Sequence, residues 1–496
     1  MKAVFSRVLI LLLICCLVLS GCNTDAPTPT TETTEPVVET TAVSYTLDDS
    51  GPAISNLSVG FGRVDISPTE STPLRGYGFS SGRMSTGIQD PLYATCIALT
   101  DSNDNTVLLF TLDMTNSYGD VMDAARLKIS EETGVPFGAI MVSATHNHSS
   151  PDLLNTAEPS IPTYIESLKT WMVEAAVAAL DDRALTRVYI TTAETENLNF
   201  VRRYQLQNGT YAGDNFGSFT NSTIVEPAEQ ADKQLLAIKF AREGKQDVVM
   251  SNWQAHVTYG TSSTSTLISS CFVGIARDHF EENTGDLFIY FTGACGNTNC
   301  VSKIGNQNRF SNYTQYSEIL SQEIINLTKT MDESHIAEFK TSKITYTGQV
   351  DHSQDGLVAV ASSVWTTWQQ TLDSATAMKH AEGYPINSVY HANRIIGNSR
   401  MDQTFDVYMV AWSFGDVSGI VLPYEMFDTN GMYIKENTPF ARTFIIGYSW
   451  PANLSYIPSA LGFENGGYET RESVELMPDK NAGYEIAENT IKLLMH

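Results

Sequence analysis

Two histidines follow directly on an apolar run in the segment Ala139-Ile140-Met141-Val142-Ser143-Ala144-Thr145-His146-Asn147-His148-Ser149-Ser150-Pro151. The apolar run predicts a buried strand, and the polar residues behind it mark the end of that strand. In an extended chain residues i and i+2 face the same side, so His146 and His148 can converge on one point. Neutral imidazole is a common zinc ligand, which makes this strand end a candidate metal site. The alternative is a histidine pair that only hydrogen-bonds its polar surroundings.

A third histidine also ends an apolar strand. The chain has nine histidines among 496 residues, and His256 follows the run Val248-Val249-Met250-Ser251-Asn252-Trp253. Catalytic zinc sites usually take three or four ligands from separate segments and keep one position open. We therefore expect His146 and His256 to share one ion with a donor from later in the chain.

Further motifs occur in order along the chain. They are Val59-Gly60-Phe61-Gly62-Arg63-Val64-Asp65, Ala144 to Pro151, Asn252-Trp253-Gln254-Ala255-His256, Leu422-Pro423-Tyr424-Glu425 and Tyr456-Ile457-Pro458-Ser459. Together they resemble the motifs of the neutral/alkaline (non-lysosomal) ceramidases across residues 58–495. The resemblance implies a fold of mixed β-sheets flanked by helices and hydrolysis of the N-acyl bond of ceramide.

The resemblance also implies a zinc centre with one ion per chain. Its four implied ligands are His146, His256, Glu425 and Tyr456. It makes His148 a catalytic residue that contacts the ligands or the transition state instead of binding the ion, and it makes Arg202 face the substrate, or Arg203 if the register shifts by one. Two nitrogen and two oxygen donors suit zinc, which polarises an amide carbonyl while a nearby donor stabilises the oxyanion. An accompanying structural calcium or magnesium is left open.

The chain departs from the ceramidase pattern where the family carries a serine that assists the attack. In the run Phe291-Thr292-Gly293-Ala294-Cys295-Gly296-Asn297, that place falls on Gly293. Three interpretations stay open: water activated by zinc attacks directly, Thr292 or Cys295 substitutes, or the chemistry is lost. We favour the first, because metal-activated hydroxide needs no protein nucleophile. Cys295 can also be a small buried residue that packs a tight turn.

The N-terminal residues predict a bacterial lipoprotein. Lys2 and Arg7 precede an apolar run at 8–19 that is too short to span a bilayer, as in a signal peptide. The run ends in Leu19-Ser20-Gly21-Cys22, which resembles a lipobox. We expect residues 1–21 to be removed, Cys22 to be lipidated, and residues 22–55 to form a disordered Thr/Pro-rich tether. The protein is then extracytoplasmic and anchored to the cell membrane.

The composition is that of a globular, acidic protein. With 30 Lys+Arg and 56 Asp+Glu the formal net charge is −26, so we expect no nucleic-acid partner. Hydrophobic residues make up 42%, enough for a core. We expect one catalytic domain at 56–496, without the immunoglobulin-like C-terminal domain of the ceramidases. Cys295 and Cys300 can form a disulfide or stay free, and the oligomeric state is not indicated.

Short β-branched runs alternate with amphipathic segments. Strands are predicted at 106–114, 139–146, 187–194, 234–240, 248–256, 286–293, 405–413, 418–422 and 444–448. Helices are predicted at 121–133, 164–180, 316–331, 357–372 and 485–495. This pattern indicates the α/β class, with mixed β-sheets flanked by helices in one layered domain.

The predicted function is that of a zinc-dependent amidohydrolase that cleaves ceramide or a related lipid into a fatty acid and a sphingoid base. A first alternative is a zinc amidase or esterase with a non-sphingolipid substrate, in view of Gly293. A second is a surface lipoprotein that binds a glycan or lipid without catalysis.

Overall fold

The computed structural model describes residues 39–44, 57–77, 82–334, 338–449, 456–472 and 478–495. The predicted signal peptide, Cys22 and most of the predicted tether lie outside these residues. All of the described residues belong to one compact unit. Within the described ranges, no helix has both the length and the apolar character needed to cross a membrane.

A nine-stranded mixed sheet forms the centre of this unit. Its strands follow the order β15-β13-β12-β7-β2-β4-β5-β6, and β17 pairs with β7 beside that path. Their bounds are β2 (Ser58–Asp65), β4 (Tyr93–Thr100), β5 (Thr106–Leu112), β6 (Ile140–Ala144), β7 (Ala184–Glu194), β12 (Gln234–Arg242), β13 (Val248–Trp253), β15 (Leu287–Thr292) and β17 (Asp332–Ser334). The pairs β5–β6 and β13–β15 are parallel.

A second sheet has five strands in the order β1-β18-β19-β20-β22. They are β1 (Glu39–Ser44), β18 (Glu338–Gln349), β19 (Thr404–Phe414), β20 (Val417–Val421) and β22 (Arg442–Ile446). Because β1 pairs antiparallel with β18, the prediction of a disordered tether over 22–55 is wrong for residues 39–44. Three of these six residues are β-branched, and the edge of β18 offers them backbone partners.

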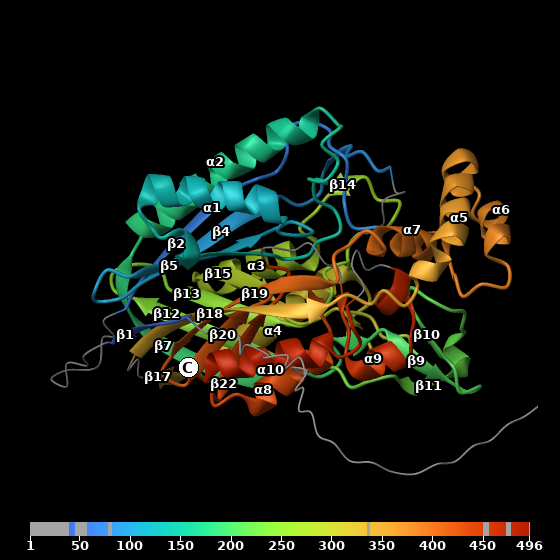
Figure 1. The fold of residues 1–496 in the computed structure, drawn as a ribbon. Helices are drawn as coiled ribbons and strands as arrows, with labels where there is room; N and C mark the ends of the chain where they lie inside the picture. The colour runs from blue at the N-terminus through green and yellow to red at the C-terminus, as the bar shows by residue number, and fades with distance from the viewer. Residues whose placement is uncertain are drawn as a thin grey trace, which may run out of the picture. The chain divides into compact units, whose positions relative to one another are not determined.

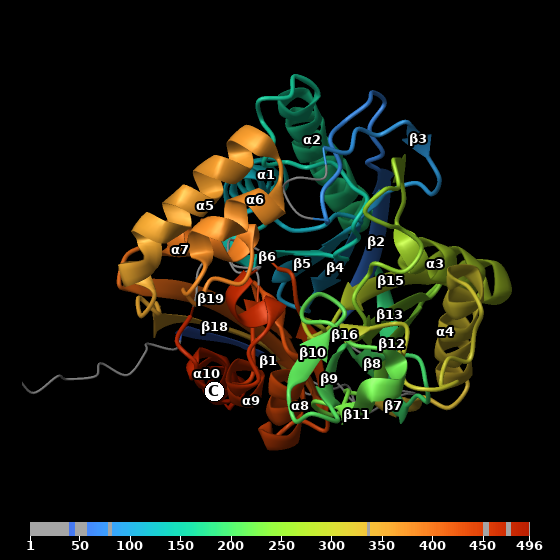
Figure 2. The same cartoon turned by 90° about the vertical axis from the view of Figure 1, so that its right-hand side faces the viewer.

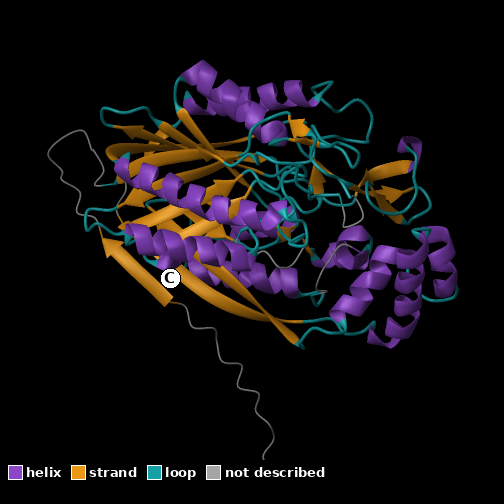
Figure 3. Cartoon of the chain, turned by 90° about the horizontal axis from the view of Figure 1, so that it is seen from above, coloured by secondary structure: helices purple, strands orange, loops and turns teal. Residues whose placement is uncertain are grey.

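Helices cover the outer faces of both sheets (Figures 1 and 3). On the nine-stranded sheet they are α1 (Gly119–Thr133), α2 (Ser160–Asp181), α3 (Cys271–Thr284) and α4 (Tyr313–Thr328). On the five-stranded sheet they are α8 (Asp428–Asn437) and α10 (Ala482–Leu494). A continuous apolar cluster fills the space between the sheets, so the fold has four layers, helix–sheet–sheet–helix. The predicted α/β class with mixed sheets flanked by helices is confirmed.

Helix α2 lies directly on strand β2 because that strand presents two glycines to it. A Cβ on Gly60 or Gly62 would lie 1.9 or 2.1 Å from the carbonyl oxygen of Ala179 or Ala175. Any larger residue at either position would push the helix off the sheet.

The remaining elements lie around the sheets. Helices α5 (Val358–Thr371), α6 (Ser374–Met378) and α7 (Val389–Asn398) pack on one another in a cluster of their own (Figure 2). Short elements are β3 (Gly87–Ile88), β8 (Phe200–Val201), β9 (Arg203–Leu206), β10 (Tyr211–Gly213), β11 (Ile224–Pro227), β14 (Leu267–Ile268), β16 (Thr298–Asn299), β21 (Glu425–Met426), β23 (Tyr456–Ile457) and α9 (Ala460–Glu464). All the predicted strands and helices are present, with ends shifted by a few residues.

Candidate metal centre

The candidate site lies where strands of both sheets end. His146 stands two residues beyond β6, and His256 three residues beyond β13. The sheets are joined at this edge, because the Asn252 side chain donates to the Ile445 carbonyl over 2.9 Å and accepts from the Ile445 N–H over 3.1 Å. Loops from separate layers therefore meet here, as is common for functional residues.

Three imidazoles face one another at this edge. Nε2 of His146 lies 3.1 Å from Nε2 of His256 and 3.2 Å from Nε2 of His148. Four zinc–nitrogen bonds of about 2.0–2.1 Å in a tetrahedron would put ligand nitrogens roughly 3.3 Å apart. The spacing of the three nitrogens therefore fits a shared metal ion.

Backbone carbonyls fix the tautomers of two of these rings. Nδ1 of His146 lies 2.7 Å from the carbonyl oxygen of Thr115, which can only accept a hydrogen bond. Nδ1 of His256 lies 3.4 Å from the carbonyl oxygen of Cys295. Each Nδ1 thus carries the proton, and each Nε2 presents a bare lone pair. Two lone pairs 3.1 Å apart repel each other, and a cation between them removes that repulsion.

Burial favours the neutral form of His148 and His256. Desolvation, followed by the charges of His146 and Arg202, lowers the pKa of His148 well below 6.5. Desolvation, followed by the charge of Arg202, lowers the pKa of His256 in the same way. Neutral imidazole is the form that binds a metal.

Glu425 supplies a carboxylate to the same centre. Its Oε2 lies 3.3 Å from Nε2 of His146 and 3.9 Å from Nε2 of His256. This oxygen is buried and receives no hydrogen bond from the described residues. A buried carboxylate oxygen without a donor is costly. Nitrogen and oxygen donors in this arrangement suit zinc, so the residues present fit the ion that the resemblance implies.

His148 lies closer to the centre than the resemblance implies. It was expected outside the ligand set, yet its Nε2 belongs to the group of three converging nitrogens. Its Nδ1 is buried and has no hydrogen-bond partner among the described residues. Of the three rings, His148 therefore has the least fixed tautomer.

Tyr456 and Arg202 lie beside this carboxylate. Strands β21 and β23 pair in parallel with Glu425 opposite Tyr456. Nη2 of Arg202 donates to the Tyr456 hydroxyl over 3.0 Å. Burial, followed by the charge of Glu425, raises the pKa of Tyr456 well above 10.

A buried glutamate holds both arginines. Nε of Arg202 donates to Glu469 over 2.9 Å, and Nη1 of Arg203 donates to the other oxygen over 2.7 Å. Arg203 otherwise binds the carbonyls of Gly462 and Gly466. Of the two arginines that the sequence leaves open, Arg202 is thus the one that contacts Tyr456. Glu469 lies in a π-helical turn, a feature common at functional sites.

Gly293 leaves no room for a serine in the present packing. A Cβ at this position would lie 2.8 Å from Oε1 and 2.9 Å from Cγ of Gln254.

The two proposed substitutes, Thr292 and Cys295, are both engaged elsewhere. Thr292 donates to the Thr145 carbonyl over 2.8 Å, and Cys295 is buried and pairs with the Tyr448 hydroxyl over 3.0 Å. Cys295 and Cys300 are free thiols.

Several residues that the sequence analysis did not single out complete the site. Thr115 fixes the His146 tautomer, Tyr448 stacks on the His146 ring, and Glu469 holds Arg202. They lie 31, 302 and 267 positions from their partners, so no local sequence signal marks them.

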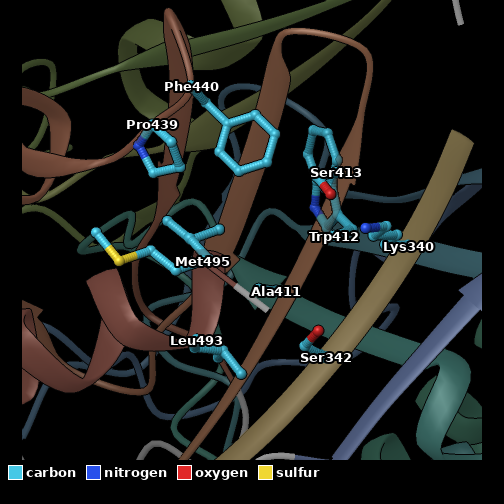
Figure 4. A pocket seen from close by; sticks show the side chains of 10 residues that line it. Lys340, Ser342, Ala411, Trp412, Ser413, Pro439, Phe440, Leu493 and Met495 are labelled. Atoms are coloured by element: carbon cyan, nitrogen blue, oxygen red, sulfur yellow. The ribbon is translucent and has the colours of Figure 1, made fainter. Parts of the chain in front are cut away.

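One pocket of about 160 Å³ lies away from this centre (Figure 4). It is formed by the end of α10, strands β18 and β19, and the segment at Pro439 and Phe440. It contains none of the predicted site residues, so the site is defined by the converging side chains instead.

The fold and the histidine cluster define an α/β protein with a candidate metal centre, and comparison with known proteins identifies the fold. No family model matches the sequence. One similar solved structure is a ceramidase complexed with C2, at 14% identity and a TM-score of 0.61, covering 88% of this chain and 75% of that one. Another is the neutral ceramidase from Pseudomonas aeruginosa, with the same identity and TM-score, covering 88% of this chain and 74% of that one. The chain has the fold of the neutral ceramidases, as the resemblance implied.

Proposed function

We propose that the protein is a zinc-dependent hydrolase that cleaves an amide bond, with the N-acyl bond of ceramide or a related lipid as its substrate. The observation that carries the proposal is the convergence of two bare imidazole nitrogens and an unpartnered buried carboxylate oxygen within a ceramidase fold. A zinc ion at this centre supplies a Lewis acid that polarises the scissile carbonyl and acidifies water.

His146, His256 and Glu425 hold the ion in this proposal. Tyr456 is the fourth donor that the resemblance implies, and His148 is the alternative that the geometry offers. The hydrogen bonds to Thr115 and Cys295 orient the imidazoles of His146 and His256. Arg202, kept charged by Glu469, is positioned to stabilise negative charge that develops at the substrate carbonyl.

The test is metal content together with turnover. The purified full-length protein is analysed by mass spectrometry for bound zinc and assayed with a fluorescent N-acyl sphingosine, with and without a chelator. Near-stoichiometric zinc and chelator-sensitive turnover support the proposal, and absence of zinc refutes it. Zinc without turnover of this lipid, but with hydrolysis of other amides or esters, identifies the non-sphingolipid alternative that Gly293 motivates.

We also propose that the protein is extracytoplasmic and anchored to the cell membrane as a lipoprotein, as residues 1–22 predict. We expect the wild type to incorporate radiolabelled palmitate in membrane fractions of the producing bacterium. Cys22→Ala should not incorporate it.

A further inference from the structure

The turn from Ala294 to Asn297 contacts several parts of the centre at once. The Cys295 carbonyl faces Nδ1 of His256. The Gly296 N–H donates over 2.9 Å to the carbonyl of Met426, the residue after Glu425. The Gly296 carbonyl accepts from Nη2 of Arg202 over 2.9 Å. This turn follows the position at which the ceramidase pattern has its serine, and here it organises the surrounding residues.

Tyr448 extends this set of contacts to His146. Its ring stacks on the His146 imidazole, with centroids 4.0 Å apart and planes inclined by 23°. The Tyr448 hydroxyl pairs with Sγ of Cys295 over 3.0 Å. All three residues are at most 3% exposed. The same cysteine therefore contacts one histidine directly and reaches the other through a tyrosine.

The stacked pair is built on unusual backbone. His146 has φ +66° and Tyr448 has φ +53°, the left-handed region that residues other than glycine rarely adopt. Such residues persist where the surrounding structure holds them, and they concentrate at functional sites. The Tyr448 carbonyl is fixed by Oγ of Ser117 over 2.7 Å and by the N–H of Ala144 over 3.1 Å. These two hydrogen bonds therefore hold in place the backbone that carries the Tyr448 ring.

We propose that Tyr448, held by Cys295, is a positioning residue that fixes the ring plane of His146, so that its Nε2 points at the metal. The hydrogen bond from Nδ1 to Thr115 restrains one edge of the imidazole, and the flat tyrosine ring restrains its tilt. This inference rests on the proposed metal centre but on neither its substrate nor its chemistry.

The surroundings of Cys295 agree with a positioning role. Its Sγ is fully buried and lies 3.0 Å from the Tyr448 hydroxyl. The side chain therefore packs the centre and is not presented to a substrate.

The test measures zinc affinity of the full-length protein by competition with a chromophoric chelator, and the visible absorption spectrum after loading with cobalt. Tyr448→Leu removes the ring and should weaken zinc affinity by about 10- to 100-fold, as for other outer partners of metal ligands. It should also change the cobalt spectrum. Tyr448→Phe and Cys295→Ala each break only the link to the thiol. Each should weaken affinity less than Tyr448→Leu, and the double variant no more than either single one.

Tyr164 provides a matched control. It is buried in the same core cluster as Tyr448, and its hydroxyl donates to the Ile66 carbonyl over 2.8 Å. Tyr164→Leu and Tyr164→Phe should lower stability without changing zinc affinity or the cobalt spectrum. Unchanged affinity and spectrum in Tyr448→Leu would overturn the proposal. If that variant does not fold, unchanged affinity in Tyr448→Phe and Cys295→Ala, or additive losses in their double variant, would overturn it.

The test distinguishes a failure of the positioning role from a failure of the proposed function. If the wild-type protein binds no zinc, both the proposed function and the positioning role are refuted. Zinc affinity and a cobalt spectrum that stay those of the wild type in Tyr448→Leu remove the positioning role alone.

Discussion

Arg202 donates a hydrogen bond from Nη2 to the hydroxyl of Tyr456 over 3.0 Å. The guanidinium is buried and also paired with Glu469, so its position and charge are both fixed. The phenol is in turn held next to Glu425 by the pairing of β21 with β23. Arg202 is thus held at the centre without being one of its proposed metal ligands.

Arg202→Met should lower kcat by about 10²- to 10³-fold, as expected for loss of one preorganised donor. At saturating zinc its metal content should stay that of the wild type, because no proposed ligand is removed. Arg202→Lys keeps the charge without the geometry of the guanidinium and should recover part of the activity. Steady-state kinetics and metal analysis check this, and full turnover in Arg202→Met would contradict the role.

His146→Ala should abolish stoichiometric zinc binding and turnover together. Its Nε2 is the nitrogen that approaches His256, His148 and Glu425 most closely. Loss of a partner outside the ligand set already costs 10- to 100-fold in affinity, so loss of this ligand should cost at least about 100-fold. His380→Ala, at an exposed histidine, is the control and should bind zinc normally. Equal zinc content in the two variants would refute the centre.

If Tyr456 is a zinc ligand, zinc binding should release a proton from its hydroxyl. Its pKa is raised by burial and by Glu425, so the phenol is neutral in the metal-free protein and must lose its proton to bind zinc. The wild type should therefore release about one proton more on zinc binding than Tyr456→Phe, in weakly buffered solution near neutral pH. Equal proton release and equal affinity, with a loss of affinity in His148→Gln, would assign the fourth position to His148 instead.

Much of the layered fold follows from local sequence. The apolar run before His146 predicts β6, and the helical spacing of Leu168 and Met172 predicts α2, where both are buried. Strand β18 was not predicted, because its exposed face carries Lys and Thr and its buried face has few large apolar residues: the buried positions within 340–349 are Ser342, Ile344, Tyr346 and Gly348. What decides β18 is pairing with β19 along its full length, which is not a local property.

The candidate site shows the same division. His146 and His256 stand out because histidine is rare here and both follow apolar strands. Glu425 and Tyr456 required the family resemblance. The contacts that orient the imidazoles involve a backbone carbonyl at Thr115 and a stacked ring at Tyr448, and such roles depend on tertiary packing alone.

The metal-free protein should lose stability as the pH falls below about 6.5. His148 and His256 have pKa values lowered by burial, so in that range the unfolded chain binds protons that the folded chain does not. Stability is therefore full above the unfolded pKa and falls by up to about 1.4 kcal/mol per pH unit for each histidine until the folded pKa is reached. Urea unfolding between pH 8 and 5 measures this, and His148→Gln should reduce the slope by about one histidine's share. A slope identical to that of the wild type would show that His148 is not buried as a neutral ring.

Gly293→Ser tests whether a hydroxyl can be restored where the ceramidase pattern has its serine. The new Cβ would come within 2.8 Å of Gln254 Oε1, so the variant should lose about 1–3 kcal/mol of stability by overpacking. Gly138→Ser is the control, because a Cβ there meets nothing within 4 Å, and it should stay within about 1 kcal/mol of the wild type. Gly293→Ser combined with Gln254→Ala makes room and should regain stability. Because the proposed hydrolysis requires no protein nucleophile, turnover should not rise in the double variant; a clear rise would show that a hydroxyl at this position limits the reaction.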